Sequence, residues 1–549
     1  MNLLRAISTV GSFTLLSRIA GFVRDILIAR FLGTTMVADA FFVAFRFPNL
    51  FRSLFAEGAF SAAFVPLFAG TLETEGHAQA RAFAREALSM LLFILVVFVG
   101  LVELGMPWIM PVLAPGFSDA PGKMELATAF AHIAFPYLLF ISLASLQSGI
   151  LNSLGKFAAA ASAPILFNVT LVTSLLVTAT LTGGGDGAGI LSAVSSAEGA
   201  SAPGTDATEA MGYALSWGVF TAGVLQFLWL AFYCWREGFP VRISLPRATP
   251  RTLKLLGRAL PVAFGSSIYQ INLVIGTLLA SLVADGAVSY LYYADRVTQL
   301  PLGVIGVAVS VALLPLLTRQ LKAGHLDSAR WSQNRAMEIG LLLTLPAAAA
   351  LMCIASPIIG ALFERGEFSP ADTAKTAAAM VAFASGLPAF VLVKILTPSF
   401  YAREDTLTPV LIAAGALVAN VAMNLVFMQI WGHVGIALAT SLASWLNATI
   451  LCVVLLRRGL FRPDPRLMGK IPRILAATAL MAGALWGVGA LLAQYGPADS
   501  GTARMIHLLV LVGAGGGAYL AGAVLLRATT AAELKDAFRR QALPETKAP

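Results

Sequence analysis

The chain has 549 residues, of which 58% are hydrophobic and only 12% are charged, whereas soluble domains carry about 25% charged residues. This balance excludes a soluble globular fold. The formal net charge of +9 suits cytoplasmic loops and attraction to anionic lipids, and it gives no reason to expect a nucleic-acid partner.

Apolar runs long enough to cross a bilayer recur from one end of the chain to the other, since a transmembrane helix needs about 20 mostly apolar residues. The first six predicted spans lie near residues 8–32, 37–70, 87–112, 127–152, 157–182 and 211–235. The others lie near 257–284, 288–318, 336–363, 376–401, 408–430, 434–456, 472–494 and 505–527. We therefore predict an all-α polytopic membrane protein with about fourteen transmembrane helices.

The charges of the connecting segments predict the orientation in the membrane. The links 236–258 and 457–473 each hold six basic residues and one acid. The connection 182–210 holds four acids and no basic residue. Because short cytoplasmic loops carry an excess of Lys and Arg, we expect both basic links in the cytoplasm and the acidic connection outside. An even number of spans then places both termini in the cytoplasm.

Short sequence elements recur in the two halves of the chain. Pro136 and Asn168 are matched by Pro388 and Asn420 at one common offset, and Gly76-His77 is matched by Gly324-His325. Such repeats are typical of secondary transporters that bind their substrate near the membrane midplane. We predict an N-terminal lobe over 1–235, a cytoplasmic amphipathic linker over 236–256, a C-terminal lobe over 257–456, and a region 457–549 with two further helices and a cytoplasmic tail.

Charged residues inside the first two spans indicate a polar cavity. The first span carries Arg18, Arg24 and Asp25, and the second carries Asp39, Arg46, Arg52 and Glu57. An arginine at the centre of a lipid-facing helix costs roughly 2.5 to 3.5 kcal/mol, so these side chains should face protein or water. One interpretation is that Arg and Asp only neutralise each other and hold helices together. The other is that the excess of arginine binds an external anion, and the planar guanidinium suits phosphate or diphosphate oxygens.

The second half of the chain offers further cationic candidates. Asp295 and Arg296 are adjacent, and neighbours on a helix point about 100° apart, so each should have its own partner and Arg296 can join the cavity. Lys394 lies in an apolar run; it either joins the cavity or extends its ammonium to the membrane surface.

Catalysis, cofactor binding and metal binding are not indicated. The three cysteines fall in separate apolar runs without ligand spacing, the five histidines are scattered, and the phosphate-binding pattern G-x-x-x-x-G-K-[ST] does not occur. We expect no cofactor, and we leave a possible coupling ion open. A cation or multidrug antiporter would need a cavity dominated by carboxylates, and a membrane enzyme would need clustered acids or histidines.

Several motifs resemble one family of transporters. These are the runs Ser17–Asp25, Ala38–Phe45, Pro48–Arg52, Phe55–Ser61, Tyr292–Arg296 and Pro398–Arg403. In these motifs the chain resembles the MurJ or MviN family of lipid II flippases, within the multidrug/oligosaccharidyl-lipid/polysaccharide exporter superfamily. Gln299 departs from the pattern, because some relatives carry an acid there.

The resemblance implies two six-helix lobes and two added helices that form a groove for a lipid tail. It implies lipid II and membrane lipids as partners, cell-wall synthesis proteins as possible partners, a monomer, and a place in the bacterial inner membrane. It assigns substrate binding to Arg18, Arg24, Asp39, Arg52 and Arg296. Secondary candidates are Asp25, Arg46, Glu57, Asp295 and Lys394. We expect alternating access driven by the membrane potential or an ion gradient; a flippase for another lipid-linked oligosaccharide remains an alternative.

Overall fold

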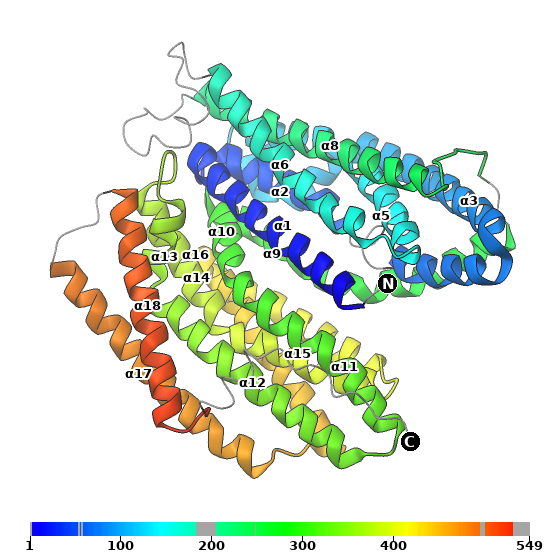
Figure 1. The fold of residues 1–549 in the computed structure, drawn as a ribbon. Coiled ribbons are helices and arrows are strands. Elements are labelled where there is room, and N and C mark those ends of the chain that lie inside the picture. The colour runs from blue at the N-terminus through cyan, green and yellow to red at the C-terminus, as the bar shows by residue number, and fades with distance from the viewer. Residues whose placement is uncertain are drawn as a thin grey trace. The chain divides into compact units, whose positions relative to one another are not determined.

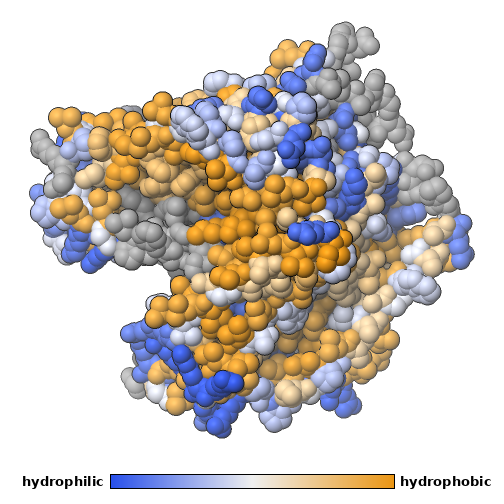
Figure 2. Space-filling model, turned by 180° about the vertical axis from the view of Figure 1, so that it is seen from behind, coloured by the Kyte–Doolittle hydropathy of each residue, from blue (hydrophilic) through white to orange (hydrophobic). Residues whose placement is uncertain are grey.

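The computed structural model describes residues 3–52, 55, 59–182, 205–246, 249–494 and 500–530, and in these ranges the regular structure is entirely helical. Ten helical segments within them are long and apolar enough to cross a membrane. Hydrophobic side chains cover wide parts of the visible surface, as a lipid-facing protein requires (Figure 2). The predicted all-α polytopic fold is confirmed, whereas the number of fourteen spans stays a prediction.

The first half of the chain contains the following elements. They are α1 (Leu3–Leu32), α2 (Met36–Arg52), α3 (Ala59–Leu113), the 3₁₀ turn η2 (Pro115–Asp119), α4 (Lys123–Ala134), α5 (Tyr137–Ser153), α6 (Phe157–Thr182), α8 (Thr205–Arg236) and α9 (Pro250–Ser281). Figure 1 shows α6 running alongside α8 and α1, and these pairs are in contact.

The second half continues the helical succession. It contains α10 (Ala287–Pro301), the π-helical turn η3 (Leu302–Gly306), α11 (Val307–Lys322), α12 (Leu326–Cys353), α13 (Ala355–Phe363), α14 (Pro370–Ser385), α15 (Leu387–Tyr401), α16 (Leu407–Arg457), α17 (Pro465–Gln494) and α18 (Gly501–Leu525). The last two, α17 and α18, lie side by side (Figure 1).

Glycines break the two longest helices at the places where the sequence separates two predicted spans. Within α3, Gly76 has φ 82° and ψ 177°, and within α16, Gly432 has φ 57° and ψ −134°. Residues with a Cβ atom rarely adopt these backbone angles, so the sharp turn depends on glycine. Each long helix therefore consists of two helical arms that meet at a glycine.

The elements that recur in the sequence have matching positions in the structure. Pro136 lies in the break between α4 and α5, and Pro388 lies in the first turn of α15, after the break that follows α14. Gly76 and Gly324 both have positive φ where one helix gives way to the next. These shared roles support the predicted internal repeat.

The helices pack into two compact units. Unit 1 comprises Met1–Tyr292 and Phe363–Asp372, and unit 2 comprises Tyr293–Leu362 and Thr373–Pro549. In unit 1, α3 packs on α5 and α9, and α2 packs on α4. Large aromatic side chains, among them Phe41, Phe42 and Phe64, are almost fully buried there. The predicted lobe boundaries stay a prediction.

The predicted amphipathic linker has little helical structure before Pro250. Residues 239–246 run without regular structure, and α9 begins at Pro250, where the Thr249 hydroxyl accepts a hydrogen bond from the Thr252 amide. Ile243 and Leu245 are 69% and 82% exposed, so the linker presents apolar side chains outward.

In unit 2 the helices α17 and α18 are attached to α12 by polar contacts as well as by packing. The buried Glu338 carboxylate of α12 accepts hydrogen bonds from Arg335, from Lys470 at 2.5 Å and from Arg466 at 3.2 Å. The Tyr519 hydroxyl of α18 donates to the Leu342 carbonyl. Hydrogen bonds at Glu338 and at Leu342 thus hold the last two helices on α12.

Candidate functional site

Arg24 and Asp25 form a buried ion pair in the C-terminal half of α1. The Arg24 Nε and Nη2 atoms donate to Asp25 Oδ1 at 3.0 and 2.7 Å, and the two residues are 5% and 0% exposed. Adjacent residues on a helix do pair here, because the long guanidinium side chain folds back along the helix. The expectation that adjacent charged residues on a helix need separate partners, which we applied to Asp295 and Arg296, therefore does not hold for every such pair in this chain.

Neighbouring helices complete this cluster. The Arg24 Nη1 atom donates to Asn168 Oδ1 on α6 at 3.0 Å, and Asn168 Nδ2 donates to the Ser17 carbonyl at 3.0 Å. The Tyr292 hydroxyl donates to Asp25 Oδ1 at 3.2 Å. These contacts fix the orientation of the guanidinium while leaving part of its donor capacity unused, since three of its five N–H groups are engaged.

Aromatic rings surround the same cluster. The Arg24 guanidinium carbon lies 5.6 Å from the centroid of the Phe167 ring, and Phe45 stacks on Phe167 with centroids 5.8 Å apart. Tyr292 stacks on Phe42 at 3.9 Å. A cation held against aromatic faces in a dry environment interacts strongly with any anion that reaches it.

The other predicted residues of α1 and α2 have different surroundings. Arg18 is exposed and has no ion pair within the described part of the chain. Arg46 donates to the Thr277 hydroxyl on α9, and Arg52 is half-buried at the end of α2. Glu57 lies outside the described residues. The structure therefore places Arg18, Arg24, Arg46 and Arg52 in unit 1.

Asp39 belongs to a second buried cluster, at the start of α2. Its Oδ2 atom accepts from Lys123 Nζ at 2.9 Å and from the Gly286 amide at 2.8 Å. Its Oδ1 atom accepts from the Ser289 amide at 2.9 Å and from the Ser289 hydroxyl at 2.7 Å. The carboxylate is 0% exposed and interacts favourably with the N-terminal end of α10. Asp39 thereby joins α2, α4 and α10.

Lys123 was not anticipated from the sequence. It is 2% exposed, pairs with both Asp39 and Asp285, and lies 4.4 Å from the centroid of the Phe117 ring. A lone lysine at the start of an apolar span suggests a side chain that reaches the membrane surface. The structure instead buries it, because its two carboxylate partners come from segments far away in the sequence.

The turn after α13 packs on the end of α1 within unit 1. The Glu367 amide donates to the Arg30 carbonyl at 2.9 Å, and the Tyr290 and Thr34 hydroxyls both donate to Asp372 Oδ1. Burial raises the pKa of the Glu367 carboxyl above its ordinary value. A Cβ on Gly366 would lie 2.2 Å from the Arg30 carbonyl oxygen, so this approach requires glycine.

The candidates of the second half lie in unit 2. Arg296 and Asp295 are half-buried on α10, and Gln299, one turn later, donates to the Asp295 carboxylate. The aliphatic part of Lys394 packs at Gly306 of η3, where an added Cβ would lie 2.9 Å from Lys394 Cδ. No ion pair holds the Lys394 ammonium within the described ranges.

The described residues contain no group of three or more His, Cys, Asp or Glu side chains placed to hold a metal ion. The buried clusters described above instead combine carboxylates with Lys or Arg side chains. Such sites bind or position charged groups, and the coupling ion remains open.

Comparisons with known proteins agree on one family. The model of the family described as lipid II flippase MurJ matches residues 28–502. A probable lipid II flippase MurJ of Rhizobium meliloti (strain 1021) is 45% identical over 489 residues, which are 88% of this chain and 86% of the relative. A probable lipid II flippase MurJ of Vibrio cholerae is 35% identical and covers 96% of each chain.

Solved structures share the fold. A lipid II flippase MurJ in an inward closed conformation superposes with a TM-score of 0.74 at 24% identity, covering 94% of this chain and 98% of the other. An inward-facing multidrug resistance transporter of the MATE family superposes with a TM-score of 0.65 at 14% identity, covering 82% and 98%. At these identities the similarity concerns the fold alone.

Proposed function

This chain belongs to the lipid II flippase MurJ family, and we propose on that basis that it moves lipid II from the cytoplasmic to the outer leaflet of the bacterial inner membrane. Members of the family are transporters, so the chain is a transporter and not an enzyme. We infer lipid II as the substrate from the names of these relatives and from the arginines of the first two helices.

The observation that best supports diphosphate binding is the state of Arg24. Its guanidinium is 5% exposed, and three of its five N–H groups are used by Asp25 and Asn168. Two N–H groups are left for phosphate oxygens, and the ion pair with Asp25 holds the fork in place. Arg18, six residues earlier on the exposed part of α1, adds a cation with no acidic partner in the described ranges.

The other candidates are assigned by their surroundings. Arg52 of unit 1 supplies a further cationic group for the diphosphate, whereas Arg296 and Lys394 of unit 2 stay candidates from the sequence. Asp39 carries four hydrogen bonds and no exposed surface, so we assign it a positioning role, with Lys123 as its partner. A carboxylate that faced the diphosphate directly would repel it.

Transport is proposed to proceed by alternating access. The arginines take the diphosphate from the cytoplasmic leaflet while the prenyl tail stays in lipid, along a groove formed by α17 and α18. Moving about two negative charges outward through an inside-negative potential of about 100 mV is favourable by roughly 4 to 5 kcal/mol. The membrane potential would then suffice as the driving force, with both termini in the cytoplasm.

The test is the distribution of lipid II between the leaflets of cells in which this chain is the sole flippase. Depletion should leave lipid II in the cytoplasmic leaflet, and re-expression of the unchanged chain should restore outward movement. Normal outward movement after depletion would refute the substrate assignment.

A flippase for another lipid-linked oligosaccharide differs only in the sugar that it carries. Transport of labelled lipid II in proteoliposomes separates the two candidate functions. If the chain is a lipid II flippase, unlabelled lipid II should compete with the label, and a prenyl-diphosphate lipid with a different sugar should not. The MATE-like fold also allows a drug or cation antiporter. That alternative predicts uptake of a cationic dye against a sodium or proton gradient, and arginine-rich spans disfavour it.

A further inference from the structure

A carboxylate and an imidazole face each other between two apolar helices of unit 1, away from the groups assigned to transport. Glu103 lies on the second arm of α3 and His132 on α4, and His132 Nδ1 is 2.6 Å from Glu103 Oε2. Glu103 precedes the end of α3 by ten residues, and His132 follows the start of α4 by nine. Since a helix rises about 1.5 Å per residue, both lie near the middle of a hydrocarbon core about 30 Å thick.

The second carboxylate oxygen of Glu103 supplies an independent indication of a ligand. The Glu103 Oε1 atom is buried and has no hydrogen-bond partner. Within the described residues, His132 is the one charged group that interacts with this carboxylate. An ionised carboxylate accepts hydrogen bonds through both oxygens, and leaving one of them buried without a donor is unfavourable. This oxygen is thus open to a proton.

The charged groups on the elements packed against α3 and α4 are engaged elsewhere or lie near helix ends. On α2, Asp39 pairs with Lys123, and Arg46 donates to Thr277 of α9. The helix α5 contains no charged residue, and Glu103 is the one charged residue of the stretch 87–113. The remaining charged residues of η2, α4, α8 and α9 lie within about three turns of an end; they are Asp119, Glu125, Asp206, Glu209, Arg236, Arg251, Lys254 and Arg258.

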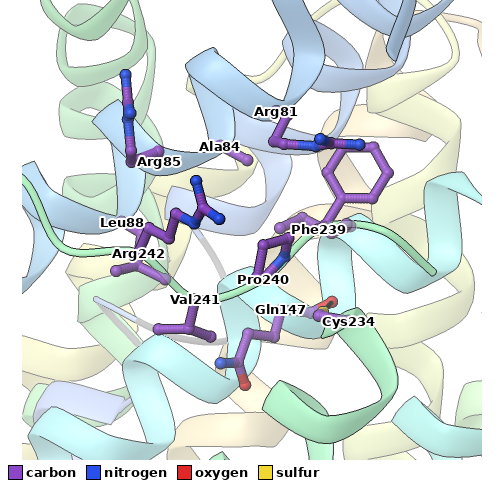
Figure 3. A pocket seen from close by; sticks show the side chains of 11 residues that line it. Arg81, Ala84, Arg85, Leu88, Gln147, Cys234, Phe239, Pro240, Val241 and Arg242 are labelled. Atoms are coloured by element: carbon purple, nitrogen blue, oxygen red, sulfur yellow. Dashed lines mark hydrogen bonds between the residues drawn. The ribbon is translucent and has the colours of Figure 1, made fainter. Parts of the chain in front are cut away.

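Basic residues of α3 itself are distant from the pair. Figure 3 shows a pocket at the other end of the same helical arm, with Arg81 and Arg85 among its lining residues. Arg85 precedes Glu103 by eighteen residues, which is about 27 Å along a helix. The two groups therefore lie near opposite ends of the membrane span.

One proton decides the net charge of this pair. With an exchangeable proton bound, Glu103 and His132 carry no net charge, either as an ion pair or as two neutral hydrogen-bonded groups. Without it, a negative charge stays near the middle of the membrane, where a net charge is unfavourable. Ion pairs removed from water are often no more stabilising than apolar residues of the same volume, so the packing of α3 on α4 does not require these groups. Glu and His side chains at such depth are typical of proton sites in transporters.

The helix α4 connects the pair to the Asp39 cluster. This helix of twelve residues carries Lys123 at its start and His132 near its end. The Lys123 ammonium donates to the Asp39 carboxylate at 2.9 Å. A rigid helix that contacts both groups gives a physical route by which a change at one can bias the other. Proton binding at His132 can therefore act on Asp39, to which we assigned a positioning role.

We propose that Glu103 and His132 bind one exchangeable proton, and that each transport cycle exchanges this proton inward for one lipid outward. The proposal rests on the proposed function and extends it by naming the coupling ion. The step places a proton on the pair and removes it again, without electron transfer. Because the outer side of a bacterial inner membrane is the more acidic one, the proton gradient would add to the membrane potential as a driving force.

The first test concerns proton binding and needs no lipid II. Infrared difference spectra of the purified full chain, recorded between two pH values, report the protonation of carboxyl groups. The spectra should contain a carboxylic acid band that E103Q removes and that E125Q, which changes an exposed glutamate of α4, retains. H132Q should shift the pH midpoint of this band, and the exposed H325Q should not. An unchanged band in E103Q would overturn the proton site.

A conservative variant keeps this test independent of the folding of E103Q. E103D retains a titratable carboxyl group, so its spectra should show the band with a different pH midpoint. A purely structural ion pair predicts no such band in the unchanged chain, and its absence there would also overturn the proposal.

The second test concerns coupling in proteoliposomes that contain labelled lipid II, with the membrane potential held at zero. Under a gradient of one pH unit, exchange of one proton for one lipid should enrich lipid II in the leaflet on the acidic side by up to about tenfold. E125Q should behave in the same way, whereas E103Q and H132Q should give a ratio near one. Lipid II movement without enrichment in the unchanged chain would overturn the coupling and leave the proposed function intact. A complete lack of lipid II movement would instead refute the proposed function and the coupling together, while the infrared band still decides the proton site.

Discussion

At the scale of single residues, the buried charges of unit 1 are all parts of small networks. Arg24 is neutralised by its neighbour Asp25 and oriented by Asn168. Asp39 is neutralised by Lys123 and by three donors at the start of α10. The two interpretations left open by the sequence, internal neutralisation and anion binding, are therefore compatible for Arg24, because its ion pair uses only part of the guanidinium.

Replacing Arg24 by Lys separates charge from hydrogen-bonding geometry. Lysine can keep the ion pair with Asp25, but it cannot also supply a fork for phosphate oxygens and a bond to Asn168. We expect membrane abundance near that of the unchanged chain and a strong loss of lipid II movement, measured by complementation in cells that lack another flippase.

The same substitution at the exposed Arg319 is the control, and it should complement fully. If R24K also complemented fully, the forked contact to the diphosphate would be excluded. If R24K were absent from the membrane, its role would be tested instead by the N168L variant, which removes the acceptor of Nη1 and leaves the ion pair.

Lys123 should matter for stability more than a surface lysine. Removing one partner of a buried ion pair costs about 3 to 5 kcal/mol, and Lys123→Met would leave the fully buried Asp39 with only its α10 donors. We expect a clear fall in the thermal midpoint of the purified protein. The midpoint is measured by size-exclusion chromatography of samples heated to increasing temperatures.

Lys156→Met provides the comparison, because Lys156 forms an ion pair with Glu237 in which the two side chains are 54% and 30% exposed. Exposed pairs contribute about 0 to 1 kcal/mol, so its midpoint should hardly change. Equal shifts for the two variants would contradict the role given to Lys123.

At the scale of elements, turns between helical arms depend on glycines and prolines. Gly76 and Gly432 divide α3 and α16, and Pro136 and Pro388 lie where the paired helices α4–α5 and α14–α15 are broken. The breaks at Gly76 and Gly432 fall between predicted spans, whereas those at Pro136 and Pro388 lie inside the spans 127–152 and 376–401, which were predicted as continuous. The attachment of α17 and α18 to α12 through Glu338 is not local, and the sequence contains no sign of it.

Gly76→Ala tests the backbone requirement alone, because a Cβ at that position would meet no atom within 4 Å. Its backbone angles cost a residue with a side chain about 1 to 3 kcal/mol, so the variant should be less stable by that amount. The thermal midpoint measured as above reports the change.

Gly70→Ala in the same helix is the matched control. It also has open space around the added Cβ, and its φ is not positive. Since alanine favours a helix over glycine by about 1 kcal/mol, this variant should be as stable as the unchanged chain or slightly more so. A loss at Gly70 as large as that at Gly76 would argue against a conformational cause.

At the scale of the whole molecule, the charges of the loops predict the orientation in the membrane, and a direct test can check that prediction. The native cysteines are first replaced by alanine, because Cys353 is exposed and would react. A membrane-impermeant maleimide added to intact cells should then label Ser195→Cys and not Leu245→Cys, which lies on the basic linker and is 82% exposed in the native chain. After permeabilisation both should react. The opposite pattern would invert the proposed topology.

The sequence by itself determined the all-helical membrane class of the protein and its family, because these depend on local quantities. Hydropathy averaged over a span, turn-forming glycines and the charge of a loop are all properties of contiguous residues. Arg18, Arg24, Asp39 and Arg52 stand out in the same way as charges in apolar runs, and among them the structure buries Arg24 and Asp39.

Only the tertiary structure decided what each of these charges contacts. Asn168 reaches Arg24 across 144 residues, Lys123 reaches Asp39 across 84, and the amide of Ser289 reaches Asp39 across 250. Helical periodicity predicts which face a side chain occupies, but it carries no information about which other helix covers that face. A buried charge must find a partner, and the packing of distant segments selects which one it finds.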